Sequence, residues 1–113
     1  MNSDGHFTRI GRVLQHIHSN YAEPLAVAEL ASSADMSRSV FHLHFRAVTS
    51  TSPMQYINAI RLHRARTLMR YEGVGASVAR RSRRLQSPSQ FGGEFKRMFR
   101  YSPGTEVAHF RAP

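Results

Sequence analysis

The sequence predicts an all-α fold of about seven short helices, and two observations support this. Apolar residues recur at helical spacing along most of the chain, whereas alternating apolar and polar runs, which would indicate strands, are missing. Proline, glycine and serine residues interrupt these runs at positions where helices typically begin or end. The length of 113 residues fits one compact domain.

Three helices are expected in the first part of the chain. Residues 7–20 carry an apolar stripe, Pro24 interrupts the chain, and residues 27–33 form a short second helix. After a tight connection, Ser37 is a good N-cap for a third helix over residues 38–47. The core side chains expected from the first two helices are Phe7, Ile10, Val13, Leu14, Ile17, Val27, Leu30 and Ala31.

The third helix is expected to have a core face and an exposed face that is free to contact a ligand. By helical spacing the core face contains Phe41, His44, Phe45 and Val48. The exposed face contains Arg38, Ser39, His42, Leu43 and Arg46.

Serine followed by proline opens three later helices, because serine caps and proline suits the first helical position. Ser52-Pro53 starts a long helix to Arg70, and helices are expected over residues 76–83, 87–99 and, after Ser102-Pro103, around Val107 and Phe110. The order indicates two similar halves joined by a rod. At about 1.5 Å per residue this rod spans roughly 27 Å, which can set two reading heads about 34 Å apart, one turn of B-DNA.

The chain is strongly basic, and its charge is uneven. Sixteen Lys and Arg residues against seven Asp and Glu residues give a net charge of +9, and Lys96 is the only lysine. Residues 1–56 hold four Arg and four acidic residues, so residues 57–113 carry the whole excess. Such a surplus favours a polyanion, above all nucleic acid, as the partner.

Several classes of protein are excluded by what the sequence lacks. Without cysteine it has no disulfide, no thiolate zinc site and no thiol nucleophile. No apolar run approaches the roughly 18 to 20 residues of a membrane span, and the polar start lacks the apolar core of a signal peptide. We therefore expect a soluble cytoplasmic protein associated with the nucleoid and without membrane contact.

Neither catalysis nor a cofactor is expected. The sequence has no glycine-rich phosphate loop with lysine, no paired-carboxylate motif and no nucleophile-and-base signature. His42 and His44, like His16 and His18, are two residues apart, which puts them on opposite faces of a helix and argues against a shared metal. We expect His44 in the core and His42 either in contact with DNA or solvated.

Two groups of residues carry a family resemblance. The first runs from Met36 to Thr49 and continues through Ser52-Pro-Met-Gln-Tyr, Arg61-Leu, Ala65-Arg and Leu68-Met69, and the second comprises Ser87-Pro-Ser-Gln-Phe, Glu94-Phe-Lys-Arg-Met-Phe and Ser102-Pro. Over about residues 8–111 the chain resembles the C-terminal DNA-binding domain of AraC/XylS transcription regulators. The resemblance implies seven helices, two homeodomain-like helix-turn-helix units and sequence-specific binding at a promoter.

The expected organisation is therefore a single DNA-binding domain. Its first helix-turn-helix unit covers residues 7–52, a linker helix covers residues 53–72, and the second unit covers residues 73–113. The resemblance implies that the base-facing residues are Ser39, His42, Leu43, Pro88, Ser89, Gln90 and Gly93. The residues expected to contact phosphates are Arg38, Arg46, Arg61, Lys96 and Arg97.

The sequence departs from the family pattern at several of these positions. The family usually has arginine at the positions of Leu43 and Gly93; arginine binds guanine, whereas leucine contacts only a thymine methyl and glycine reads nothing. Gly92 and Gly93 also weaken a helix by roughly 0.8 to 1 kcal/mol each relative to alanine. Before Tyr101, where relatives tend to have glycine, this chain has Arg100. Base selectivity is expected to be weak or different.

The segment from Val78 to Leu85 departs most. The family has apolar residues at the positions of Arg80 and Arg83, and a glycine at Arg84, where a turn needs positive φ. Since burying unpaired arginine costs several kcal/mol, we expect these side chains to reach solvent, the helix to rotate, or the segment to loosen. A phosphate-binding face, a solvated face and a damaged helix all stay open as interpretations. The second unit is expected to be a degenerate copy that binds phosphates more than it reads bases.

The favoured function is a transcription regulator that binds double-stranded DNA as a monomer, with RNA polymerase as a further candidate partner. Two alternatives stay open: a degenerate regulator that acts through protein interaction, and a non-specific nucleic-acid binder. The salt dependence of DNA binding and competition with random DNA discriminate among the three.

Overall fold

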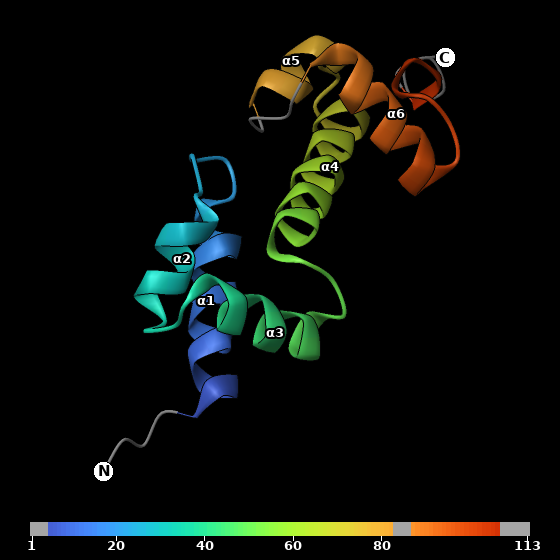
Figure 1. The fold of residues 1–113 in the computed structure, drawn as a ribbon. Coiled ribbons are helices and arrows are strands. Elements are labelled where there is room, and N and C mark those ends of the chain that lie inside the picture. Colours follow the sequence, from blue (N-terminus) through green and yellow to red (C-terminus); the bar gives the residue numbers. More distant parts are fainter. Residues whose placement is uncertain (1–4, 83–86, 107–113) are drawn as a thin grey trace. The chain divides into compact units, whose positions relative to one another are not determined.

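The computed structural model describes residues 5–82 and 87–106. Within these ranges the chain is helical with no strand, which confirms the all-α prediction (Figure 1). The expected break at residues 84–86, Arg83 and the last helix around Val107 and Phe110 lie outside the described residues. The helices are α1 (His6–Asn20), α2 (Val27–Ser33), α3 (Arg38–Thr49), α4 (Pro53–Tyr71), α5 (Ala76–Ser82) and α6 (Pro88–Phe99), and residues 103–106 begin a seventh helical stretch.

The chain divides into two compact units, Met1–Asn58 and Ala59–Pro113. The boundary falls inside α4, so the start of this helix belongs with α1 to α3 and the remainder with α5 and α6. No helix among the described residues is both long and apolar enough to cross a bilayer.

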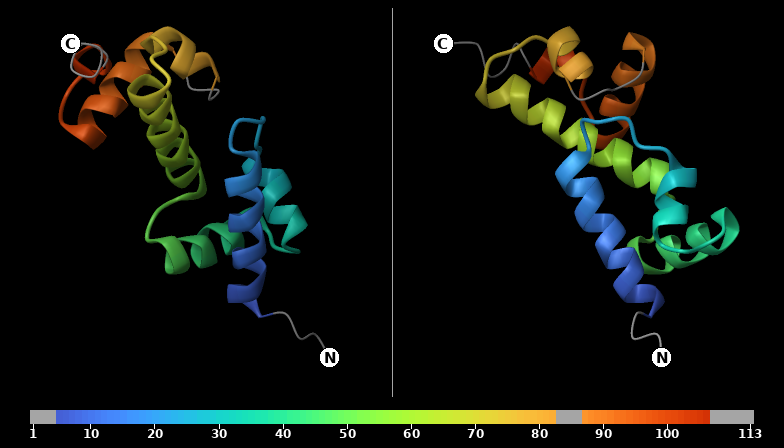
Figure 2. Two further views of the ribbon diagram at one scale, coloured as in Figure 1. Left: turned by 180° about the vertical axis from the view of Figure 1, so that it is seen from behind. Right: turned by 90° about the vertical axis from the view of Figure 1, so that its left-hand side faces the viewer.

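In the first unit α3 packs against both α1 and α2, and in Figure 1 and the left view of Figure 2 it runs crosswise to α1. Tyr56 fastens the start of α4 to this unit, because its hydroxyl lies 2.6 Å from His18 Nε2 and its ring meets Phe45 edge-on at 5.5 Å. The buried apolar side chains of α1 to α3 are Ile10, Val13, Ile17, Leu30, Ala31, Phe41 and Phe45.

Three side chains predicted for this core lie elsewhere. Phe7 is 74% exposed, because it sits in the first turn of α1 on the flank of the buried stripe. Val48, in the last turn of α3, is 38% exposed. His44 is half-buried and stacks on His6 with 3.8 Å between ring centroids, so it packs at the edge of the core instead of inside it.

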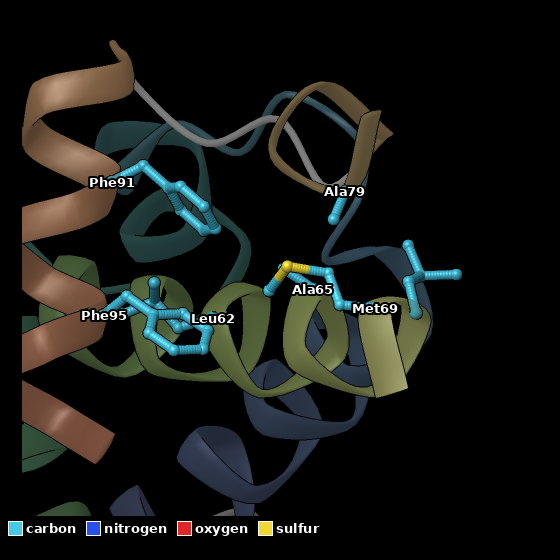
Figure 3. Packing of buried hydrophobic residues seen from close by; sticks show 7 residues of the cluster. Leu62, Ala65, Met69, Ala79, Phe91 and Phe95 are labelled. Atoms are coloured by element: carbon cyan, nitrogen blue, oxygen red, sulfur yellow. The ribbon is translucent and has the colours of Figure 1, made fainter. Parts of the chain in front are cut away.

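The second unit has its own core, in which α4, α5 and α6 meet (Figure 3). Phe91 and Phe95 of α6 point toward α4, and Ala79 comes from α5. Phe95 also meets Phe99 and Tyr101 edge-on, so aromatic rings continue this core to the end of α6. The buried residues are Leu62, Ala65, Leu68, Met69, Ala79, Phe91 and Phe95.

Left-handed backbone conformations mark several helix ends. Gly73, two residues after the end of α4, has φ +69°, a conformation that glycine adopts without the steric cost of a side chain. Ser50 and Arg100 adopt the same conformation after α3 and α6, with φ 65° and 72°. The family's turn glycine is therefore absent before Tyr101, but the turn forms with Arg100 in its place.

Candidate nucleic-acid interface

The helix α3 is held by a cap at each end. Ser37 Oγ accepts a hydrogen bond from the Val40 amide at 3.2 Å, which confirms the predicted N-cap. At the other end the Ser50 amide donates to the Arg46 carbonyl at 2.8 Å, so the helix runs two residues beyond the predicted end at residue 47. Two buried phenylalanines fix which side of this capped helix faces the core.

The predicted DNA-contacting residues of α3 are all exposed. Phe41 and Phe45 are fully buried, whereas Leu43, on the opposite side, is 67% exposed. The exposed residues that the sequence assigned to bases and phosphates are Arg38, Ser39, His42, Leu43 and Arg46. Since α3 contains no acidic residue, this side is uniformly neutral or positive.

The helix α6 repeats the design of α3. Ser87 Oγ accepts from the Gln90 amide at 3.3 Å, Pro88 occupies the start of the helix, and Phe91 and Phe95 face the core. The Arg100 amide closes the end by donating to the Lys96 carbonyl at 2.8 Å. The exposed residues assigned to DNA on this helix are Pro88, Ser89, Gln90, Gly93, Lys96 and Arg97.

Equivalent residues of the two helices are separated by a constant 50 positions. The cap serines are Ser37 and Ser87, the first buried phenylalanines are Phe41 and Phe91, and the left-handed closing residues are Ser50 and Arg100. Local sequence reasoning predicted the two units without finding this fixed offset, although it can be read from the serine and phenylalanine positions alone. It aligns Leu43 with Gly93, the two positions at which the family's arginine is absent.

Arg61 behaves differently from the other predicted phosphate contacts. Its side chain is only 6% exposed, on α4, and it has an interaction partner within the protein. This burial disfavours a contact with a DNA backbone, because a guanidinium must reach the surface to meet a phosphate. The remaining four cations, Arg38, Arg46, Lys96 and Arg97, are exposed.

The arginine cluster at the end of α5 does not prevent that helix from forming. The helix runs from Ala76 to Ser82 with Ala79 fully buried. Arg80 is half-buried and has an interaction partner, and Arg81 is exposed. Neither side chain is fully buried, and Arg83 and Arg84 lie outside the described residues.

Glu106 is a buried residue that stabilises the position of α6, and sequence reasoning did not identify it. Although it is fully buried, its Oε1 accepts hydrogen bonds from Tyr101 Oη at 2.7 Å, Arg66 Nε at 3.0 Å and Arg70 Nη2 at 3.4 Å. Arg66 also lies over the Phe99 ring, 4.6 Å from its centroid. This cluster, Arg66, Arg70, Tyr101 and Glu106, ties the end of α6 and the following turn to α4, and so holds α6 in place within its unit.

The histidines do not gather into a metal site within the described ranges, where no group of three or more potential ligands occurs. His42 is exposed on α3, and His16 bonds with Asn20 on α1. On α4, burial and the nearby charge of Arg66 lower the pKa of His63, whose ring meets Phe99 edge-on at 5.1 Å.

Comparisons with known proteins agree with this arrangement. A family model described as "Helix-turn-helix domain" matches residues 30–108. The chain is similar to the RCS-specific HTH-type transcriptional activator RclR of Escherichia coli K12, with 33% identity over 96 residues, 85% of this chain and 34% of the relative. It is also similar to the HTH-type transcriptional regulator MtrA of Neisseria gonorrhoeae, with 27% identity over 85% of this chain and 32% of the relative. The chain thus spans about a third of the length of these relatives.

Solved structures give the same picture. The DNA-binding domain of AdpA, described as the global transcriptional factor in complex with a target DNA, matches with a TM-score of 0.77 and 29% identity, covering 97% of this chain and 96% of that one. An AraC-type DNA-binding domain protein of Chromobacterium violaceum matches in fold with a TM-score of 0.80 and 23% identity, covering 93% and 94%.

Proposed function

Because the chain belongs to the AraC/XylS family of helix-turn-helix proteins, we propose that it is a transcription regulator that binds double-stranded DNA in a sequence-dependent way. One observation carries the proposal. Two helices, each fixed by a serine cap and two buried phenylalanines, expose sides that bear cations and hydrogen-bonding groups. A rigid helix with such a side is the element that enters a major groove.

In this proposal each helix uses some residues to contact bases and others to contact phosphates. On α3 the bases are met by Ser39, His42 and Leu43, and phosphates by Arg38 and Arg46. On α6 the phosphates are met by Lys96 and Arg97, while Pro88, Ser89, Gln90 and Gly93 face the bases. Gly93 offers no side chain to a base, so α3 supplies most of the discrimination and α6 mainly adds affinity.

The proposal extends to how the protein works in the cell. One chain supplies both reading helices, so we propose that it binds as a monomer, on the nucleoid in the cytoplasm. It acts by binding alone, without catalysis. RNA polymerase is the protein that it would contact once it occupies a promoter.

Selection of bound duplexes from a random pool, followed by titration in increasing salt, tests the proposal. If six or more phosphates are contacted, affinity for the selected duplex falls by about a thousandfold or more between 50 and 200 mM salt. Arg46→Gln and Lys96→Gln should each lower the salt slope by about one and weaken binding to all sequences alike. Arg9→Gln removes the same charge from α1, a helix to which the proposal assigns no DNA contact, and should change neither.

Two outcomes would replace the proposal with its alternatives. A folded protein that binds no duplex even in dilute buffer would point to a protein-interaction module. Binding that random DNA competes away as well as the selected duplex does would point to a non-specific nucleic-acid binder.

A further inference from the structure

The exposed side of α3 carries an apolar stripe that the fold itself does not use. Val40, Leu43 and Ala47 follow one another at helical spacing and are all exposed, Leu43 to 67% and Val40 to 39%. At about 100° per residue, Leu43 lies about 180° around the helix from the midpoint between Phe41 and Phe45. The core of the first unit therefore cannot bury Leu43 while the two phenylalanines stay in place.

The surroundings of this stripe match DNA better than a protein partner. Arg46 lies beside its end, Ser39 and His42 flank Leu43, and Arg38 is exposed at the start of the helix. The helix has no acidic residue that would favour a basic protein surface. A duplex offers phosphates on both sides of the major groove, where the arginines can bind, and base edges between them, where the stripe lies.

Thymine is the base that supplies an apolar feature at that place. Its C5-methyl group projects into the major groove, whereas the other base edges present hydrogen-bonding atoms. We propose that the stripe Val40, Leu43 and Ala47 packs against thymine methyl groups, with Leu43 as the residue that selects thymine in the half-site bound by α3. This inference rests on the proposed function, because it requires α3 to lie in a major groove.

Replacing thymine by deoxyuridine isolates the methyl group. Deoxyuridine keeps the pairing edge, the O4 acceptor and the phosphate charge, and lacks only the C5-methyl. In the duplex selected from the random pool, each thymine is replaced singly, and the affinity of the intact protein is measured by fluorescence anisotropy. Binding should weaken about fourfold at each thymine whose methyl Leu43 covers, and remain unchanged at thymines outside that half-site.

Two variants tie the effect to the side chain. Leu43→Ala should bind the thymine and deoxyuridine duplexes with equal affinity, because the group that senses the methyl is gone. Phe7→Ala removes another strongly exposed apolar side chain, 74% exposed on α1, and should keep the fourfold difference. Both positions are exposed, so the helical content of both variants, followed by circular dichroism, should match that of the parent protein.

The outcomes separate this inference from the function on which it rests. If no duplex binds, both fail together. If a duplex binds but deoxyuridine has no effect at any position, or the effect survives in Leu43→Ala, the thymine contact is overturned while DNA binding stands. If Leu43→Ala binds the selected duplex as tightly as the parent does, Leu43 makes no contact with thymine and the inference is wrong.

Discussion

Replacement of Glu106 by glutamine should destabilise the second unit. The carboxylate is fully buried, and its Oε1 accepts hydrogen bonds from Tyr101, Arg66 and Arg70. Glutamine has the same shape and keeps one acceptor, but it loses the charge that pairs with the two arginines. It also places an amide NH₂ where Oε2 now lies, a buried position at which the described part of the chain offers no hydrogen-bond partner.

The size of the effect follows from the burial of the partners. Removing one member of a fully buried ion pair costs about 3 to 5 kcal/mol. The Arg66 and Arg70 side chains are 29% and 23% exposed, so water can solvate them in part after the loss. We therefore expect a loss of about 2 kcal/mol, a large share of the roughly 5 to 15 kcal/mol that stabilises a typical domain.

Urea unfolding followed by circular dichroism measures this loss, and Glu72→Gln is the matched control. Glu72 is exposed directly after α4, so the same change of charge there should stay within about 0.5 kcal/mol of the parent protein. Hydrogen exchange should show reduced protection in α6 and unchanged protection in α3. If Glu106→Gln and Glu72→Gln unfold at the same urea concentration, the buried cluster does not stabilise this unit and the reasoning fails.

Two further changes test other features of the second unit. Arg100→Gly should raise the free energy of unfolding by about 1 kcal/mol, because glycine adopts φ 72° without a side-chain clash. Arg97→Gly, inside α6, should lower the free energy of unfolding by about 1 kcal/mol. A lower stability in both variants would contradict the proposed strain at Arg100. His63 has a lowered pKa in the folded chain through burial and Arg66, so the unfolded chain binds its proton more readily and stability falls as pH drops through the unfolded value. Thermal unfolding between pH 8 and 5 should therefore show a smaller acid-induced loss in His63→Gln than in the parent, and identical pH profiles would argue against this linkage.

The features that sequence predicted well are those decided locally. A serine cap acts on an amide three residues away, so Ser37 and Ser87 marked the starts of α3 and α6 correctly. Helical spacing likewise identified the face of α3 that contains Phe41 and Phe45. The same spacing placed the predicted base-facing side chains of α3 on its exposed side.

The sequence did not predict features that depend on contacts between helices. Spacing put Phe7 and Val48 on a core face, but it cannot say where the covering helices end, and both lie in terminal turns. The buried Glu106 depends on residues 36 and 40 positions away, which only the folded chain brings together. Arg61 was assigned to phosphates from resemblance, although the fold buries it.

The single lysine of the sequence allows α6 to be modified selectively. Lys96 is the only lysine in the sequence and is exposed on the helix proposed to grip phosphates in the second half-site. An amine-reactive fluorophore would attach to no other side chain, since guanidinium groups do not react under the same conditions. An amide formed at Lys96 has no positive charge, so labelling with the amino terminus already blocked should weaken duplex binding, and the loss would measure what this one amine contributes.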